Sequence, residues 1–302
     1  GLFGNCQGYY GTVEAQGKGT LHLHLLIWLE GHPNPQAMRD AFEKDPTYKN
    51  AIFKWLDDVI ATSTPGSMDV VTLESDARPS LPKGEPDPRS VMAPQAADFD
   101  DVEEFNAASS AFISKLVTCT NWHVHSDTCW KKLKKGEARD DAHCRLGIDG
   151  STRPITMLDP DSGSILYRRL HPRINNYNPT TIHGIQSNMD IKHIGSGEGA
   201  KACLYYVTDY ITKFSLPVHS GLAALSYALK RNNEKFDGVS WASAETKEKS
   251  LLTKSVNAMM ARMEISHQQV MSYLVGGGDH YASHTFRNLY WGTLDRYIRT
   301  LD

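Results

Sequence analysis

Two histidines stand one residue apart inside a short apolar run. The run is "TLHLHLLIWL", residues 20–29, and the histidines are His22 and His24. Successive side chains of a β-strand point to opposite faces, so both imidazoles project from one face and can reach one ion, while Leu21, Leu23 and Leu25 are expected to face a core on the other side. The preceding run "YYGTVEAQ" places Glu14 and Gln16 on a shared face, and the "GKG" that follows predicts a hairpin turn. Two imidazoles with a carboxylate or amide oxygen suit Mg²⁺ or Mn²⁺ holding a phosphate, or zinc. Histidines bonded only to backbone groups would give the same pattern.

Two tyrosines four residues apart are the second candidate for chemistry. Periodicity predicts a helix over 200–214, on which Tyr206, Tyr210 and Lys213 share one face. A tyrosine is a weak nucleophile, because its usual pKa is near 10. Attack on a phosphodiester would need a metal or a cation to stabilise the developing charge, and Lys213 could supply that cation. Tyrosines at this spacing also commonly serve only for packing.

A cluster of cysteines and histidines follows in "CTNWHVHSDTCWKKLKKGEARDDAHC". Thiolates and imidazoles are the ligands that a tetrahedral structural zinc site prefers. The chain has five cysteines, an odd number, which favours metal ligation over a disulfide framework. The predicted zinc ligands are His123, His125, Cys129 and Cys144, with Cys119 as the alternate. The basic residues between the last two cysteines could hold a phosphate backbone, or could be a solvated loop.

The elements that would position these residues can be read along the chain. A hairpin is predicted over 9–29, helices over 34–45, 48–62 and 105–117, and short strands over 68–75 and 187–194. Residues 78–104 are rich in proline and acid and predict an exposed loop. Helical patterns return over 221–233, 247–265 and 266–278. The sequence thus alternates sheet and helix rather than repeating one unit.

Composition bounds the class of protein. The 302 residues are 40% hydrophobic, which is enough for a globular core, and the formal net charge is −3. No global basicity indicates nucleic acid, so a polyanion would have to bind at a local patch. No apolar run approaches the length of a membrane span, so we expect no membrane partner.

Taken in order, these motifs resemble the replication-initiator region of Helitron transposases, also called the Helitron helicase-like N-terminal domain. The matching stretches are "YYGTVEAQGKGTLHLHLLIWLEG", "HVHSDTC" with a later "CR", "SNMDI" and "ACLYYVTDYITK". The resemblance extends over nearly the whole chain. Two departures stand out: Lys18 replaces the arginine usual in the family, and the chain has no GxxxxGK[ST] phosphate loop.

The resemblance implies an HUH endonuclease, named for two histidines around a hydrophobic residue. In that family a divalent ion on the histidines polarises a phosphate of single-stranded DNA, and a tyrosine attacks it to leave a 5′-phosphotyrosine. His22 and His24 match the histidine pair, and Tyr206 and Tyr210 match the two tyrosines. Glu14 and Gln16 both match the E-x-Q stretch, so either could be the third ligand. The partners implied are transposon ends and a helicase domain fused in the full-length protein, and the implied location is the nucleus.

We therefore expect an α+β nuclease domain over 1–215, with a mainly antiparallel central sheet, HUH endonuclease-like, flanked by helices. The 78–104 loop and a zinc-stabilised insertion over 115–150 would interrupt it, and 216–302 would form a helical extension. Asn188 and Asp190 match the family's N-x-D stretch and are expected near the site. Two alternatives remain: a catalytically degenerate zinc-stabilised domain that binds DNA, and a metal hydrolase that uses no tyrosine.

Overall fold

The computed structural model describes residues 1–15, 20–131, 133–195, 205, 216, 218–263, 267–285 and 290–300. Within those residues the chain is α+β, with one small antiparallel sheet, a two-stranded ribbon and eight α-helices. The chain divides into two compact units. Unit 1 consists of Gly1, Phe3–Glu30 and Tyr205–Asp302, and unit 2 consists of Leu2 and Gly31–Leu204.

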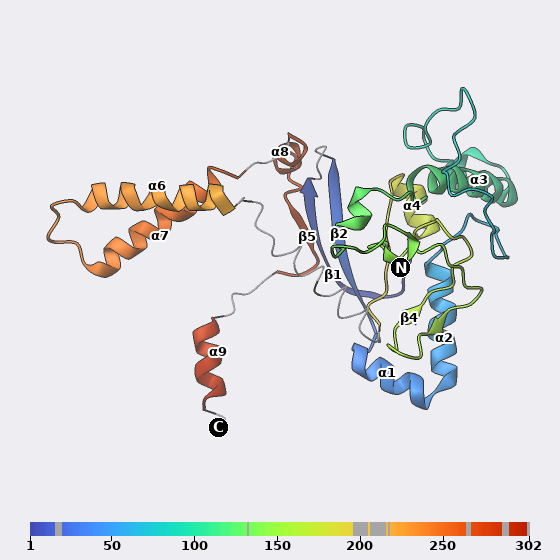
Figure 1. The fold of residues 1–302 in the computed structure, drawn as a ribbon, viewed down its shortest axis with the longest axis horizontal. Helices are drawn as coiled ribbons and strands as arrows, with labels where there is room; N and C mark the ends of the chain where they lie inside the picture. Colours follow the sequence, from blue (N-terminus) through green and yellow to red (C-terminus); the bar gives the residue numbers. More distant parts are fainter. Residues whose placement is uncertain are drawn as a thin grey trace. The chain divides into compact units, whose positions relative to one another are not determined.

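The sheet of unit 1 has β1 (Cys6–Ala15) at its centre. β2 (Leu21–Leu29) pairs antiparallel with one edge of β1 and β5 (His280–Ala282) with the other, as Figure 1 shows. The predicted hairpin is therefore confirmed. Glu14 lies directly opposite His22, and Thr12 lies opposite His24. Opposed residues of an antiparallel pair share a face, so the histidines and Glu14 project from the same side of the sheet.

The other face of β2 carries leucines. Leu21, Leu23 and Leu25 are each 46% exposed, although the alternation of the strand led us to expect them in a core. Alternation separates the two faces of a strand, but it does not say which face another layer covers. Here His22 and His24 are partly buried, whereas Leu21, Leu23 and Leu25 are exposed.

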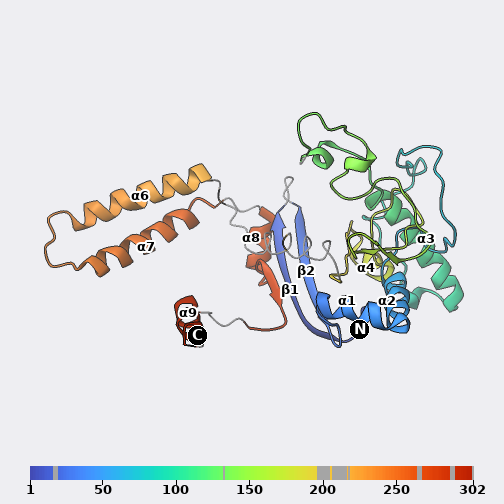
Figure 2. The same cartoon turned by 60° about the horizontal axis from the view of Figure 1, so that its bottom comes forward.

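The helices of unit 1 follow the predicted patterns in its described residues. α6 (Val218–Phe236) and α7 (Ala244–Met260) lie side by side as a hairpin in Figures 1 and 2. Their contact is built on Ala224, Ala228 and Ala258, whose small side chains let the two backbones approach closely. α8 (His267–Leu274) contacts β1, and α9 (Trp291–Ile298) follows.

Unit 2 begins with two short helices that share one capping residue. α1 (Pro35–Lys44) ends at Asp45, whose carboxylate accepts from the first backbone N–H groups of α2 (Pro46–Val59). α3 (Val102–Thr120) and α4 (Pro179–Ile185) then pack together. The ribbon consists of β3 (Met157–Leu158) and β4 (Ile165–Leu166). The helices predicted for this part of the chain are confirmed.

The core of unit 2 lies between α3 and the segment that leads into α4. Ile113 and Val117 of α3 contact Ile174, Tyr177 and Ile182. Tyr177 is completely buried, and its hydroxyl donates to the carbonyl of Ser63 at 2.6 Å. This core holds the chain that precedes the Cys/His cluster against the chain that follows it.

The strands predicted over 68–75 and 187–194 are wrong. Both segments are irregular, because their backbone groups bond to scattered partners instead of a ladder. The N–H of Val71 donates to the carbonyl of Leu170, and the N–H of Met189 donates to the side chain of Asn121. The exposed 78–104 loop is held in place, since the amide of Gln186 donates to the carbonyls of Pro88 and Val91.

Candidate functional site

The first candidate site is the histidine face of the unit 1 sheet. The rings of His22 and His24 meet edge to face with centroids 4.6 Å apart, and Nε2 of His24 lies 3.3 Å from Oε1 of Glu14. Burial, and then the neighbouring His24, lower the pKa of His22, while Glu14 raises it less. The lowered pKa favours the neutral imidazole of His22, which is the form that can ligate a metal.

This face is an open arrangement rather than a closed cage. Among the described residues, the one group of at least three His, Cys, Asp or Glu side chains that could hold a metal ion is the Cys/His cluster of unit 2, whose ligand atoms all lie within 4.8 Å of one another. Glu14, His22 and His24 do not form such a group, so metal binding at this face stays a prediction. Gln16, the other candidate third ligand, lies outside the described residues.

The predicted nucleophiles and their cation also lie outside the described residues, so their approach to the histidines stays a prediction. These residues are Tyr206, Tyr210 and Lys213. Tyr205, directly before the pair, is helical and 78% exposed.

A third histidine on the same face was missed by the sequence analysis. His280 of β5 lies opposite Thr12, which is also the partner of His24. Its Nδ1 lies 2.7 Å from the carboxylate of Asp279, and its ring stacks on Tyr10. A strand of three residues gives no usable periodicity, and its pairing with β1 spans almost the whole chain.

The second candidate site brings the four predicted zinc ligands together. Nε2 of His123 lies 3.1 Å from Nδ1 of His125, 3.6 Å from the sulfur of Cys129 and 3.4 Å from the sulfur of Cys144. A tetrahedral zinc ion with ordinary bond lengths would separate two nitrogens by about 3.3 Å and a nitrogen and a sulfur by about 3.6 Å. The cluster could therefore hold such an ion, and Cys119 is not part of it.

Local structure explains how these ligands converge. The N–H of His123 donates to the carbonyl of Arg173 at 2.7 Å, beside an isolated β-bridge between Trp122 and Ile174. Cys129 sits in a 3₁₀ turn (Asp127–Trp130), and Cys144 directly follows another (Asp141–His143). Both thiols are buried in a small cluster with Ile148. The ligands are thus themselves the core of this segment.

Two charged side chains orient His125 from outside the cluster. Nε2 of His125 lies 2.6 Å from Oδ1 of Asp141, and a carboxylate can only accept, so Nε2 carries the proton and Nδ1 faces the other ligands. Arg173 donates to both oxygens of Asp141 and to both oxygens of Asp76. Its side chain is only 4% exposed. Neither Asp141 nor Arg173 could be predicted from local spacing, because nothing in that spacing connects Arg173 to His125.

The pKa values of His123 and Cys129 favour metal ligation, whereas that of His125 is raised, because the effect of burial, which lowers it, is outweighed by hydrogen bonds with Cys129 and Asp141. Burial, and then the neighbouring His125, lower the pKa of His123 to about 4. For Cys129, burial would raise the pKa, but hydrogen bonds from the Ser126 backbone and from His125 outweigh it, so the pKa is lowered. A neutral imidazole and a readily formed thiolate are the states that bind zinc.

The N-x-D stretch falls in unit 2. Asn188 lines a pocket beside His123, and Asp190 pairs with Lys192 at 3.1 Å. Their expected nearness to His22 and His24 stays a prediction.

No family model, curated protein or solved structure matches the chain. In the described residues, no helix has the length and apolar character to cross a membrane. The functional reading therefore depends on the two candidate sites and on the motifs.

Proposed function

We propose that this chain is an HUH endonuclease of a rolling-circle transposon of the Helitron type, which nicks and joins single-stranded DNA. The observation that supports this most is the pairing of β1 with β2, which sets Glu14 opposite His22 and within 3.3 Å of His24. Two imidazoles and a carboxylate on one open sheet face can bind a divalent ion and leave positions for a phosphate.

Each residue would have a distinct role. His22 and His24 would hold Mg²⁺ or Mn²⁺, with Glu14 or Gln16 as the third ligand. Glu14 also accepts from His24 in the described face and would fix the orientation of that ring. When bound, the ion would polarise the scissile phosphate.

Tyr206 and Tyr210 would act as the nucleophiles. The phenol oxygen of one tyrosine attacks phosphorus, the bond from phosphorus to the 3′ oxygen breaks, and that oxygen takes up a proton. The products are a 5′-phosphotyrosine and a free 3′ hydroxyl. Lys213, three residues after Tyr210, would stabilise the charge on the phosphate. The second tyrosine would allow strand transfer after the first cleavage.

The Cys/His cluster would have a structural role in this enzyme. Two thiolates and two imidazoles are a zinc set, and four protein ligands leave no open position for a reaction. The zinc would fix the segment over 121–150, whose lysines could meet a DNA backbone. A fused helicase and a nuclear location belong to the same proposal.

The proposal is tested by trapping the covalent intermediate. Labelled single-stranded oligonucleotides carrying transposon-end sequences are incubated with protein and Mn²⁺, and adducts that survive denaturation are counted. We expect an adduct in the wild type and none in the double variant Tyr206→Phe, Tyr210→Phe. His22→Ala with His24→Ala should also abolish it, and Glu14→Ala should reduce it.

Tyr205→Phe is the matched control, because it removes a neighbouring hydroxyl that does not fit the four-residue spacing. It should leave adduct formation unchanged. Cleavage without an adduct in the double variant would favour a metal hydrolase. Binding of DNA with no cleavage on any sequence would favour the degenerate binding domain.

A further inference from the structure

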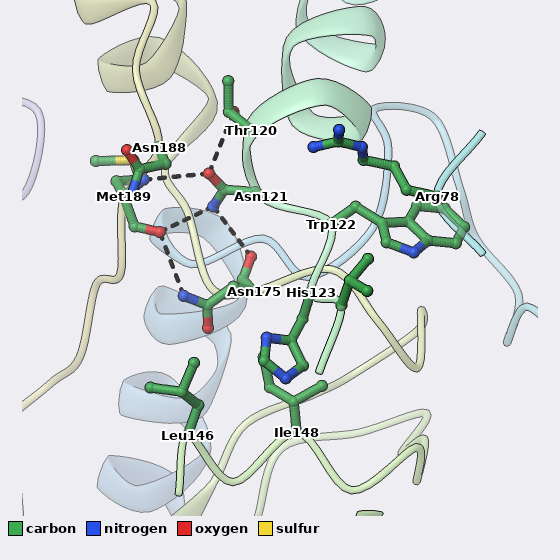
Figure 3. Close-up of a pocket in the computed structure, with 11 residues that line it drawn as sticks. Arg78, Thr120, Asn121, Trp122, His123, Leu146, Ile148, Asn175, Asn188 and Met189 are labelled. Atoms are coloured by element: carbon green, nitrogen blue, oxygen red, sulfur yellow. Dashed lines mark hydrogen bonds between the residues drawn. The ribbon is translucent and has the colours of Figure 1, made fainter. Parts of the chain in front are cut away.

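A pocket of about 580 Å³ lies in unit 2 beside the zinc-ligand candidate His123. Figure 3 shows Arg78 and Trp122 on one side of it, Asn188 and Met189 on the other, and Leu146 and Ile148 below. None of the 11 residues drawn there is acidic. The nuclease chemistry proposed above makes no use of this pocket.

The aromatic wall of the pocket is held in a fixed orientation. The indole N–H of Trp122 donates to the carbonyl of Asp76 at 3.2 Å, and the ring meets His171 with centroids 4.5 Å apart. The isolated bridge to Ile174 fixes its backbone. An indole that is locked before a ligand arrives loses little entropy on stacking.

The opposite wall presents polar edges. Asn121 is buried and fully used, since its amide donates to the carbonyls of Asn175 and Met189 and accepts from the N–H of Met189. This holds Asn175 and Asn188 at the pocket. Within the described residues, Nδ2 of Asn188 and Oδ1 of Asn175 have no hydrogen-bond partner. A donor and an acceptor therefore remain for a ligand.

The mouth of the pocket carries one cation. Arg78 is exposed and donates through Nη1 to the carbonyl of Cys119 at 2.9 Å, which leaves its other N–H groups for an anion. The pocket thus combines an aromatic face, an aliphatic floor, amide edges and a guanidinium. These are the groups that proteins use to bind an unpaired nucleotide, with the base stacked and the phosphate outside.

We propose that this pocket binds one unpaired base of the DNA strand, stacked on Trp122, with Asn188 at its polar edge and Arg78 on the adjacent phosphate. The inference rests on the proposed function for the identity of the strand as single-stranded DNA. It gives Asn188 of the N-x-D stretch a role in holding the DNA strand.

The test blocks the pocket with a bulky side chain and uses photocrosslinking to locate the bound base. Leu146→Trp places a bulky ring on the floor, and Met92→Trp adds the same side chain at a position that is 83% exposed in the same unit. Affinity for a labelled thymine oligonucleotide is measured by fluorescence anisotropy. The same oligonucleotide with one 5-iodouracil is photocrosslinked, and the attached peptide is identified by mass spectrometry.

We expect Leu146→Trp to weaken binding about tenfold or more, since one stacked base contributes roughly that factor. The wild type and Met92→Trp should crosslink through the peptide that contains Trp122, and Leu146→Trp should lose that crosslink. Zinc content is measured in every variant, because His123 borders the pocket. If Leu146→Trp loses zinc, Asn188→Ala on a separate segment replaces it and should weaken binding in the same direction.

Unchanged affinity in the filled variant, or crosslinks that map elsewhere, would overturn the inference. Failure of the proposed function looks different. A protein that forms the tyrosyl adduct but is indifferent to Leu146→Trp refutes the pocket alone. A protein that forms no adduct yet crosslinks at Trp122 supports the pocket as a DNA-binding site and contradicts the proposed nuclease activity.

Discussion

His171 is a buried histidine that unit 2 uses as a hydrogen-bond acceptor. Its side chain lies beside Trp122, and the whole residue is 5% exposed. Nδ1 accepts from the N–H groups of Arg173 and Ile174, both at 3.1 Å. Protonation of Nδ1 would remove both bonds, and burial, followed by the nearby Arg169, lowers the pKa of His171 to about 4.

The sign of the pH dependence follows from this shift. Above pH 6.5 the ring is neutral in both the folded and the unfolded chain, so its contribution to stability is complete. As the pH falls from 6.5 towards 4, the unfolded chain takes up a proton that the folded chain does not, and stability is lost. At about 1.4 kcal/mol per pH unit, lowering the pH from 7 to 5 should cost at most about 2 kcal/mol through His171.

His171→Asn is the matched variant, because Oδ1 of asparagine can replace Nδ1 as the acceptor and does not titrate. Urea unfolding of both proteins is followed by tryptophan fluorescence at pH 7 and pH 5, with excess zinc. The two should be similar in stability at pH 7, and the wild type should lose up to about 2 kcal/mol more at pH 5. Other titrating groups are common to both proteins and cancel. Equal losses in the two proteins would refute the reasoning.

Three further predictions concern unit 2. Tyr177→Phe removes the buried hydroxyl bonded to Ser63 and should lower the free energy of unfolding by about 1–2 kcal/mol; no change in urea would contradict the bond. Asn178→Ala removes the cap of α4 and a buried donor to the carbonyl of Val59, and should lower the free energy of unfolding by about 2–3 kcal/mol. The matched variant Asn34→Ala removes the exposed cap of α1 and should lower it by about 1 kcal/mol. Equal losses in the two variants would contradict the role of burial. Arg173→Lys has three donors on one atom, so it cannot keep the four hydrogen bonds to Asp76 and Asp141, and it should weaken zinc binding roughly 10- to 100-fold in chelator competition; unchanged affinity would show that Asp141 holds His125 without it.

Short-range patterns predicted the parts of the sites that are local in sequence. The alternation of side chains along a strand and a short turn are enough to predict that Glu14 lies opposite His22, because a hairpin pairs strands that are adjacent in the sequence. The convergence of His123, His125, Cys129 and Cys144 into one cluster was also predicted, since these side chains lie within one irregular segment. Cys119 belongs instead to α3, where burial raises the pKa of its thiol.

The parts that could not be predicted depend on distant residues. The N–H of Met189 donates to the side chain of Asn121, 68 residues earlier, and is therefore not available for a strand pairing. Arg173 reaches His125 from 48 residues away. Neither contact can be seen in local periodicity, because each depends on how the end of α3 and the residues after it meet the segments on either side of α4.

The contact between His32 and His193 has a consequence for the order of folding. Their Nε2 atoms meet inside unit 2, near the two points where the chain passes between the units. The sheet of unit 1 forms only when β1 pairs with β5. Tyr9 of β1 and Ser283, directly after β5, are hydrogen-bonded although 274 residues separate them in the sequence. Once unit 2 has folded, the histidine contact removes 161 residues from that loop, more than half of it. The entropy of closure then falls by only about 0.6–0.8 kcal/mol, because it depends on the logarithm of length. Prior folding of unit 2 would therefore make the pairing of β1 with β5 only a few times more favourable, and that pairing keeps the large sequence separation that is typical of slow folding steps.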